Sequence, residues 1–170
     1  MPVSAGSGAG IGRRAALRRG ALLVAAAAAA PMLGVIEACA ANGPRAIAYD
    51  HDECAYCRMV VSDPRFAAAM VTAKGRTLPF DSIECLAGFY AQSRRDHGRD
   101  ATRSLWVSDY APPGQLIAAE RARFLRVEGP GSPMGKGLMA FRSDDDARRV
   151  SSAAATSGWT EVVALVERSA

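Results

Sequence analysis

The sequence predicts an α+β protein that contains two similar strand–strand–helix units, and three observations support this. Short apolar segments typical of strands alternate along the chain with turns that contain glycine or proline. Two segments have the polar residues that begin helices. These two segments also resemble each other, because Phe80–Leu86 (FDSIECL) and Phe141–Ala147 (FRSDDDA) each follow a predicted strand and open a predicted helix.

The first unit is expected to contain two strands and one helix. A strand at Phe66–Ala73 is followed by a turn at Lys74–Arg76 and a returning strand at Thr77–Phe80. A helix opened by Asp81–Ser82 then runs to about Ser93, and a polar linker covers Arg94–Arg103. Gly75 suits a turn position with positive φ. The helix has one apolar face formed by residues at helical spacing: Ile83, Leu86, Ala87 and Tyr90.

The second unit is expected to repeat this plan and to close with a strand. Its first three strands are predicted at Ser104–Asp109, Phe124–Val127 and Gly137–Phe141, separated by a turn at Ala111–Gly114 and a loop at Gly129–Pro133. A helix at Ala147–Ala155 and a closing strand at Thr160–Glu167 follow. Ser143 and the aspartates that follow it cap the helix, and their charges favour its positive end. Gly158 is expected to end this helix.

The chain has 170 residues, of which 49% are hydrophobic and 22% charged, so it can bury a core in one domain or two small ones.

The charge of the chain excludes nucleic acid as the default partner. Its formal net charge is +4, but four of the 21 basic residues and one of the 17 acidic residues precede Cys39. The remaining 17 basic and 16 acidic residues are nearly balanced, which leaves no electrostatic basis for binding a phosphate backbone.

Residues 1–39 are predicted to be an export signal. Basic residues in segment 11–20 (IGRRAALRRG) precede sixteen residues without charge, Ala21–Ile36, and then small residues. This apolar run is shorter than the roughly 20 residues of a membrane span. The pair Arg18–Arg19 resembles a twin-arginine export signal, although ordinary signals also carry adjacent arginines.

Cys39 is the predicted site of lipid attachment. Ile36–Cys39 (IEAC) resembles a bacterial lipobox, from which the charged Glu37 departs. The alternative is simple cleavage near Ala38 or Ala41, which would release a soluble periplasmic protein. In either case residues 40–48 are expected to be a tether, and residues 49–168 the folded domain, with its first unit at about 49–95 and its second at about 104–168.

Three cysteines remain after Cys39, and they suggest a site for a soft metal ion. Cys54, Cys57 and Met59 form a C-x2-C-x-M motif, and Cys85 opens the first predicted helix. An odd number of cysteines in an exported protein does not suit a pure disulfide framework. Thiolates and thioethers favour Cu(I), and a thioether binds it without losing a proton. Met134, in the loop sequence Ser-Pro-Met-Gly, is a further candidate ligand, and the alternative for both methionines is an ordinary place in the core.

Two other uses of these sulfurs stay open at this point. Zinc prefers four ligands, and the chain offers the three cysteines together with His51 or His97. Cys54 and Cys57 also have the spacing of an oxidised pair, either structural or redox-active, although no thioredoxin-like βαβ pattern surrounds them. The chain shows no glycine-rich phosphate loop, no Ser/His/Asp set and no paired carboxylates, so catalysis is not supported.

These motifs together resemble the NosL family of exported copper chaperones, which serve the maturation of nitrous-oxide reductase. The resemblance runs from about Tyr49 to Val166 and rests on motifs in the expected order: Glu53–Met59, Asp63–Phe66, Lys74–Gly75, Phe80–Leu86, Pro133–Gly135 and Ala140–Phe141. It implies a compact two-lobed α+β module of two similar strand–strand–helix–strand units. Arg58 stands where glycine is common in the family.

The resemblance also implies a function and a set of ligands. It implies a periplasmic Cu(I) site that uses Cys57 and Met59, with Met134 as a further candidate and with Cys54 and Cys85 at family positions. It implies no enzymatic activity, but delivery of copper to the copper–sulfide centre of nitrous-oxide reductase, with copper received from an export machinery. The alternatives are a thiol–disulfide redox protein, a zinc-stabilised binding module that uses Cys54 and Cys57, and a mercury-handling relative of similar fold.

Overall fold

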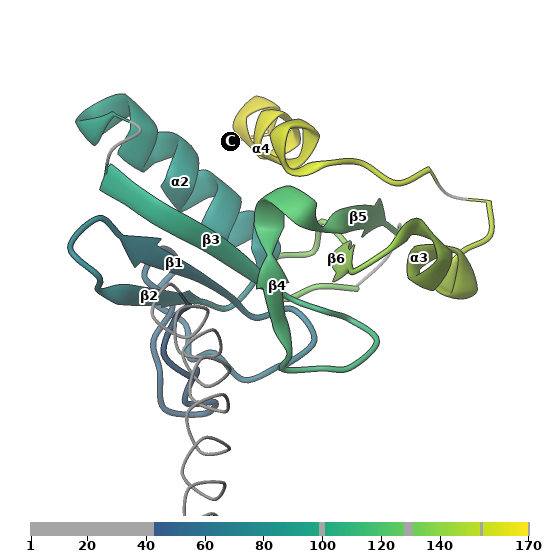
Figure 1. Ribbon diagram of the computed structural model, residues 1–170, viewed down its shortest axis with the longest axis horizontal. Helices are drawn as coiled ribbons and strands as arrows, with labels where there is room; N and C mark the ends of the chain where they lie inside the picture. Colours follow the sequence, from purple (N-terminus) through teal and green to yellow (C-terminus); the bar gives the residue numbers. More distant parts are fainter. Residues whose placement is uncertain (1–42, 99–100, 128–130, 154, 170) are drawn as a thin grey trace, which may run out of the picture. The chain divides into compact units, whose positions relative to one another are not determined.

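A four-stranded antiparallel sheet forms the first part of the fold (Figure 1). The computed structural model describes residues 43–98, 101–127, 131–153 and 155–169, so the signal segment and Cys39 lie outside it. The strands follow the order β2-β1-β3-β4, with these bounds: β1 Ala68–Thr72, β2 Thr77–Phe80, β3 Thr102–Ser108 and β4 Leu116–Ala118. The predicted turn between β1 and β2 is confirmed, with Gly75 at φ 81°.

Helix α2 (Ile83–His97) follows β2 and packs against β1 and the last helix of the chain. Its predicted cap is confirmed, because the Oγ of Ser82 accepts a hydrogen bond from the backbone N of Cys85 at 3.1 Å. The helix continues beyond the predicted end at about Ser93 to His97, where Gly98 caps it. The polar linker was therefore predicted too early: Arg94, Arg95 and His97 lie in the last turn, where they favour the negative end of the helix dipole.

The second part contains a two-stranded antiparallel sheet, β5 (Arg123–Arg126) and β6 (Leu138–Phe141), preceded by the short 3-10 helix η2 (Ala119–Arg121). Helix α3 (Asp144–Val150) follows β6. The Oγ of Ser143 accepts from the backbone N of Asp146 at 3.2 Å, as Ser82 does in α2. The predicted similarity of the two strand-to-helix segments is therefore confirmed at their caps.

The predicted closing strand Thr160–Glu167 is wrong, because these residues belong to helix α4 (Trp159–Arg168). Its valines favour a strand by local preference. The buried residues instead have the 3.6-residue period of a helix face: Trp159, Val162, Val163 and Val166. Gly158 begins this helix rather than ending the previous one, and its backbone N donates to Glu161 Oε2 at 3.1 Å.

The α+β class is confirmed, but the repeat of the two units is incomplete. β3, predicted to start the second unit, pairs with β1 and completes the first sheet. The first unit therefore reads strand–strand–helix–strand, whereas the second ends in two helices. α3 ends at Val150, short of the predicted Ala155, and the short strand β4 was not predicted.

The larger of two hydrophobic clusters surrounds α2 and contains two of the cysteines, Cys54 and Cys85. Helices α2 and α4 lie side by side (Figure 1), with the rings of Tyr90 and Trp159 5.9 Å apart. Within residues 40–48, expected as a tether, Ile47 is buried and Arg45 pairs with Asp52 at 2.7 Å. Among the described residues, no helix combines the length and apolar character needed to cross a bilayer.

Candidate metal centre

A closed loop presents the first two cysteines of the site. An antiparallel bridge between Glu53 and Val60 joins its two ends. Inside the bridge, the backbone N of Cys54 donates to the carbonyl oxygen of Met59 at 2.8 Å, and that of Arg58 donates to Cys54 at 3.1 Å. Arg58 has φ 69°, so it adopts the left-handed conformation that glycine takes without strain, at a cost of roughly 1–2 kcal/mol.

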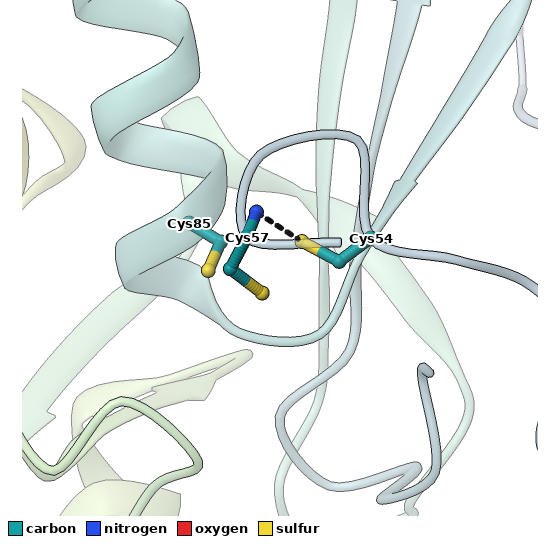
Figure 2. A group of neighbouring side chains, drawn as sticks. All are labelled: Cys54, Cys57 and Cys85. Carbon is teal, nitrogen blue, oxygen red and sulfur yellow. Dashed lines mark hydrogen bonds between the residues drawn. The ribbon is translucent and has the colours of Figure 1, made fainter. Parts of the chain in front are cut away.

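The third cysteine comes from the first turn of α2. The Ser82 cap fixes the backbone of Cys85, and the loop docks beside it because the backbone N of Ala55 donates to Pro79 in β2 at 2.9 Å. The three sulfur atoms of Cys54, Cys57 and Cys85 all lie within 4.8 Å of one another. Figure 2 shows the three side chains pointing toward a common space, from the loop on one side and from α2 on the other.

The cluster has a buried side and an open side. Cys54 and Cys85 are fully buried, whereas Cys57 is only partly buried. All three are free cysteines, outside any disulfide. A metal ion held by them would therefore sit at the edge of the core, with Cys57 as the ligand nearest to solvent.

Hydrogen bonding concentrates negative charge on Cys54. The thiol of Cys85 donates to it and lowers the pKa of Cys54 to about 5, assisted by the backbone N–H groups of Asp81, Cys57 and Tyr56. The contact with Cys54, together with burial, raises the pKa of Cys85. Burial raises the pKa of Cys57. At neutral pH these shifts favour a thiolate at Cys54 and protonated thiols at Cys57 and Cys85, so a metal ion that uses all three must displace protons.

The two candidate methionines are both exposed, but only Met59 lies on the same loop as Cys54 and Cys57. Met59 belongs to the cysteine loop, and 55% of its surface is accessible. Met134 is 40% exposed and lies on a separate loop that precedes β6. Neither methionine is packed into the hydrophobic clusters of the described residues.

The fold separates the histidines from the cysteine cluster. His97 ends α2, twelve residues after Cys85, which corresponds to about 18 Å along the helix. His51 is exposed and lies outside the group of potential ligands found among the described residues. His97 is thereby removed as a fourth zinc ligand.

Two buried carboxylates at the site were not predicted from the sequence as functional residues. Asp81 and Glu84 flank the Ser82 cap, and they are 2% and 3% exposed. Burial and the nearby charge of Cys54 raise the pKa of Asp81. The segment DSIEC was noted for its helix cap, but only the fold shows that both acids face inward.

Fold and site together define a small α+β protein with a three-thiol centre suited to a soft metal ion. The chain belongs to the NosL family, whose model matches residues 46–162. Among solved structures, it is similar in fold to the copper chaperone NosL from Shewanella denitrificans, with a TM-score of 0.56 and 18% sequence identity over 71% of this chain and 95% of that one. A comparison with curated proteins gave no match.

Proposed function

We propose that this chain is a metallochaperone that binds Cu(I) at Cys54, Cys57 and Cys85. The observation that carries the proposal is the convergence of their three free sulfurs within 4.8 Å of one another. Thiolates favour Cu(I), whereas a structural zinc site usually has four protein ligands, and the described cluster contains three. Membership of the NosL family and the fold shared with a copper chaperone support the same cargo.

The open side of the cluster suits transfer of the ion. Cys57 is partly buried, and Met59 is exposed on the same loop. A thioether binds Cu(I) without a proton to lose or regain, so Met59 and Met134 are the proposed additional ligands. A ligand from a partner protein can approach from this side while Cys54 and Cys85 still hold the ion.

The proposed client is nitrous-oxide reductase, and the copper is for its copper–sulfide centre. Family membership supports this client and a supply of copper from an export machinery. The basic and apolar signal segment, followed by Cys39, supports a periplasmic location with a lipid anchor in the membrane. The protein has no catalytic role in this proposal.

The test is an anaerobic Cu(I) titration of the chain from Ala40 onward, against a chromogenic chelator, with Zn(II) in parallel. We expect one Cu(I) to bind tightly and Cys57→Ser to weaken binding. Met59→Leu should weaken it less, and Val60→Ala, a neighbouring exposed apolar residue without sulfur, should leave it unchanged. Tight Zn(II) binding without Cu(I) binding would indicate a zinc-stabilised module, and a stable Cys54–Cys57 disulfide would indicate a redox protein.

Transfer is tested separately. The Cu(I)-loaded chain is mixed with copper-free nitrous-oxide reductase, and the visible absorption of the reductase's copper centres is followed. Faster loading from the chain than from the same concentration of chelated Cu(I) supports this client. Equal rates from the two copper sources would contradict it, although Cu(I) binding itself would stand.

A further inference from the structure

Glu84 is a buried carboxylate with a defined set of contacts at the start of α2. It immediately precedes Cys85 and is 3% exposed. Its Oε1 accepts from the Oγ of Ser132 at 2.6 Å and from the backbone N of Leu138 at 3.5 Å. Its Oε2 is buried without a hydrogen-bond partner among the described residues. Burying a carboxylate with one unpaired oxygen is unfavourable, so the hydrogen bonds to its other oxygen are what holds this side chain in place.

The partner of Glu84 organises the loop that carries Met134. Ser132 donates its hydroxyl hydrogen to Glu84, while its Oγ accepts from the backbone N of Gly137 at 3.0 Å. Its carbonyl oxygen accepts from the backbone N of Gly135 at 2.9 Å. Gly137 has φ 68°, and a Cβ there would collide with the Val127 carbonyl. The loop is thus held in one shape by Ser132, and Ser132 is held by Glu84.

The consequence is a direct link between helix α2 and the loop before β6. Glu84 belongs to the helix that supplies Cys85, whereas Ser132 lies two residues before Met134 in the loop before β6. Met134 is 40% exposed and takes no part in the hydrophobic clusters of the described residues. Its sulfur therefore remains available, and its backbone position depends on the contact between Glu84 and Ser132.

We propose that Glu84 is a positioning residue of the copper site, which fixes the Met134 loop beside Cys85 through Ser132. This inference rests on the proposed function, because it assigns Met134 as a ligand of the bound Cu(I). Glu84 does not bind the ion in this scheme. It sets the place from which the thioether reaches the sulfur cluster.

The test combines Cu(I) affinity with the number of sulfur atoms around copper, measured by X-ray absorption on the chain from Ala40 onward, which contains the whole compact unit that begins at Asn42. We expect Met134→Leu and Glu84→Ala each to lower the affinity about tenfold and to remove one sulfur from the copper shell. The double variant should be no weaker than either single variant, since both changes remove the same ligand.

Two further variants separate positioning from other roles of the carboxylate. Glu84→Gln keeps an oxygen that accepts from Ser132, so it should keep both the affinity and the sulfur count. Asp109→Asn is the matched control, because it alters a buried carboxylate that pairs with Arg142. It should leave copper binding unchanged. Where Glu84→Ala does not fold, Ser132→Ala tests the same link and should also lose one sulfur.

The inference is overturned if Glu84→Ala or Ser132→Ala retains the full sulfur count, or if the losses in Glu84→Ala and Met134→Leu multiply in the double variant. It is also overturned if Glu84→Gln binds as weakly as Glu84→Ala, which would assign the effect to the charge. Copper binding that requires Cys57 but is indifferent to Met134→Leu refutes this inference alone. A chain that does not bind Cu(I) refutes the proposed function as well.

Discussion

Replacing Ser82 with alanine removes the hydrogen bond that orients Cys85 at the start of α2. The Oγ of Ser82 accepts from the backbone N of Cys85 at 3.1 Å, and Ser82 is fully buried. Losing a serine N-cap costs about 1 kcal/mol, and a buried amide left without a partner costs about 1–3 kcal/mol. We therefore expect the free energy of unfolding to fall by about 2 kcal/mol.

Ser143 provides a matched control, because it caps α3 in the same way. Its Oγ accepts from the backbone N of Asp146 at 3.2 Å. Helix α3 has 7 residues, of which only Ala147 is buried, so its first turn can fray without exposing much of the core. Ser143→Ala should cost about 1 kcal/mol or less.

Two assays separate stability from metal binding. Urea unfolding of the metal-free protein measures the cost of each substitution, and anaerobic Cu(I) competition measures affinity. Ser82→Ala should weaken Cu(I) binding about tenfold, as expected for a group that orients a ligand. Cys54 and burial raise the pKa of Cys85, and the Ser82 hydroxyl opposes that rise. Wild-type Cu(I) affinity in Ser82→Ala, or an equal loss in Ser143→Ala, would refute this reasoning.

Three further predictions concern the loops and the thiolate. Arg58→Gly should raise the free energy of unfolding by about 1 kcal/mol by relieving its positive φ, whereas Ala55→Gly in the same loop should lower it; equal effects in urea unfolding would contradict this. Gly137→Ala should destabilise the protein far more than Gly135→Ala, because only the former meets a backbone carbonyl; similar melting temperatures would argue against that loop geometry. The pKa of Cys54 is about 5, below its usual value of 9.0, so between these pH values the unfolded chain binds more protons than the folded one. Stability of the metal-free protein should therefore rise with pH across this range, and the part of it that comes from Cys54 should be lost as pH falls through 5; anaerobic unfolding that shows the same rise in Cys54→Ser would exclude Cys54 as its source.

The parts of the fold that follow from short-range interactions could be predicted from the sequence. The turn at Gly75 and the caps at Ser82 and Ser143 involve residues within a few positions of one another, and all three are present. The C-x2-C spacing likewise placed Cys54 and Cys57 on one loop, because three residues cannot carry their sulfurs far apart.

The predictions that failed depend on contacts between distant segments. The segment Thr160–Glu167 contains several valines and was predicted to be a strand, but burial against α2 and Phe124 selects the helical period of α4. β3 was assigned to the second unit because of its position in the chain, whereas its partner β1 lies about thirty residues earlier. Local preference is weak compared with the apolar surface that such pairings bury.

The sequence by itself indicated a site for a soft metal ion, because it supplies thiol and thioether side chains at close spacing, and the order of its motifs indicated the NosL family. Only the tertiary structure decided that Cys85 joins Cys54 and Cys57, that His97 is too distant, and that Glu84 is buried against Ser132. These facts require the distances between residues far apart in the chain. Such distances arise when α2 packs against the sheet and against the second part of the fold. This packing cannot be predicted from a local sequence pattern.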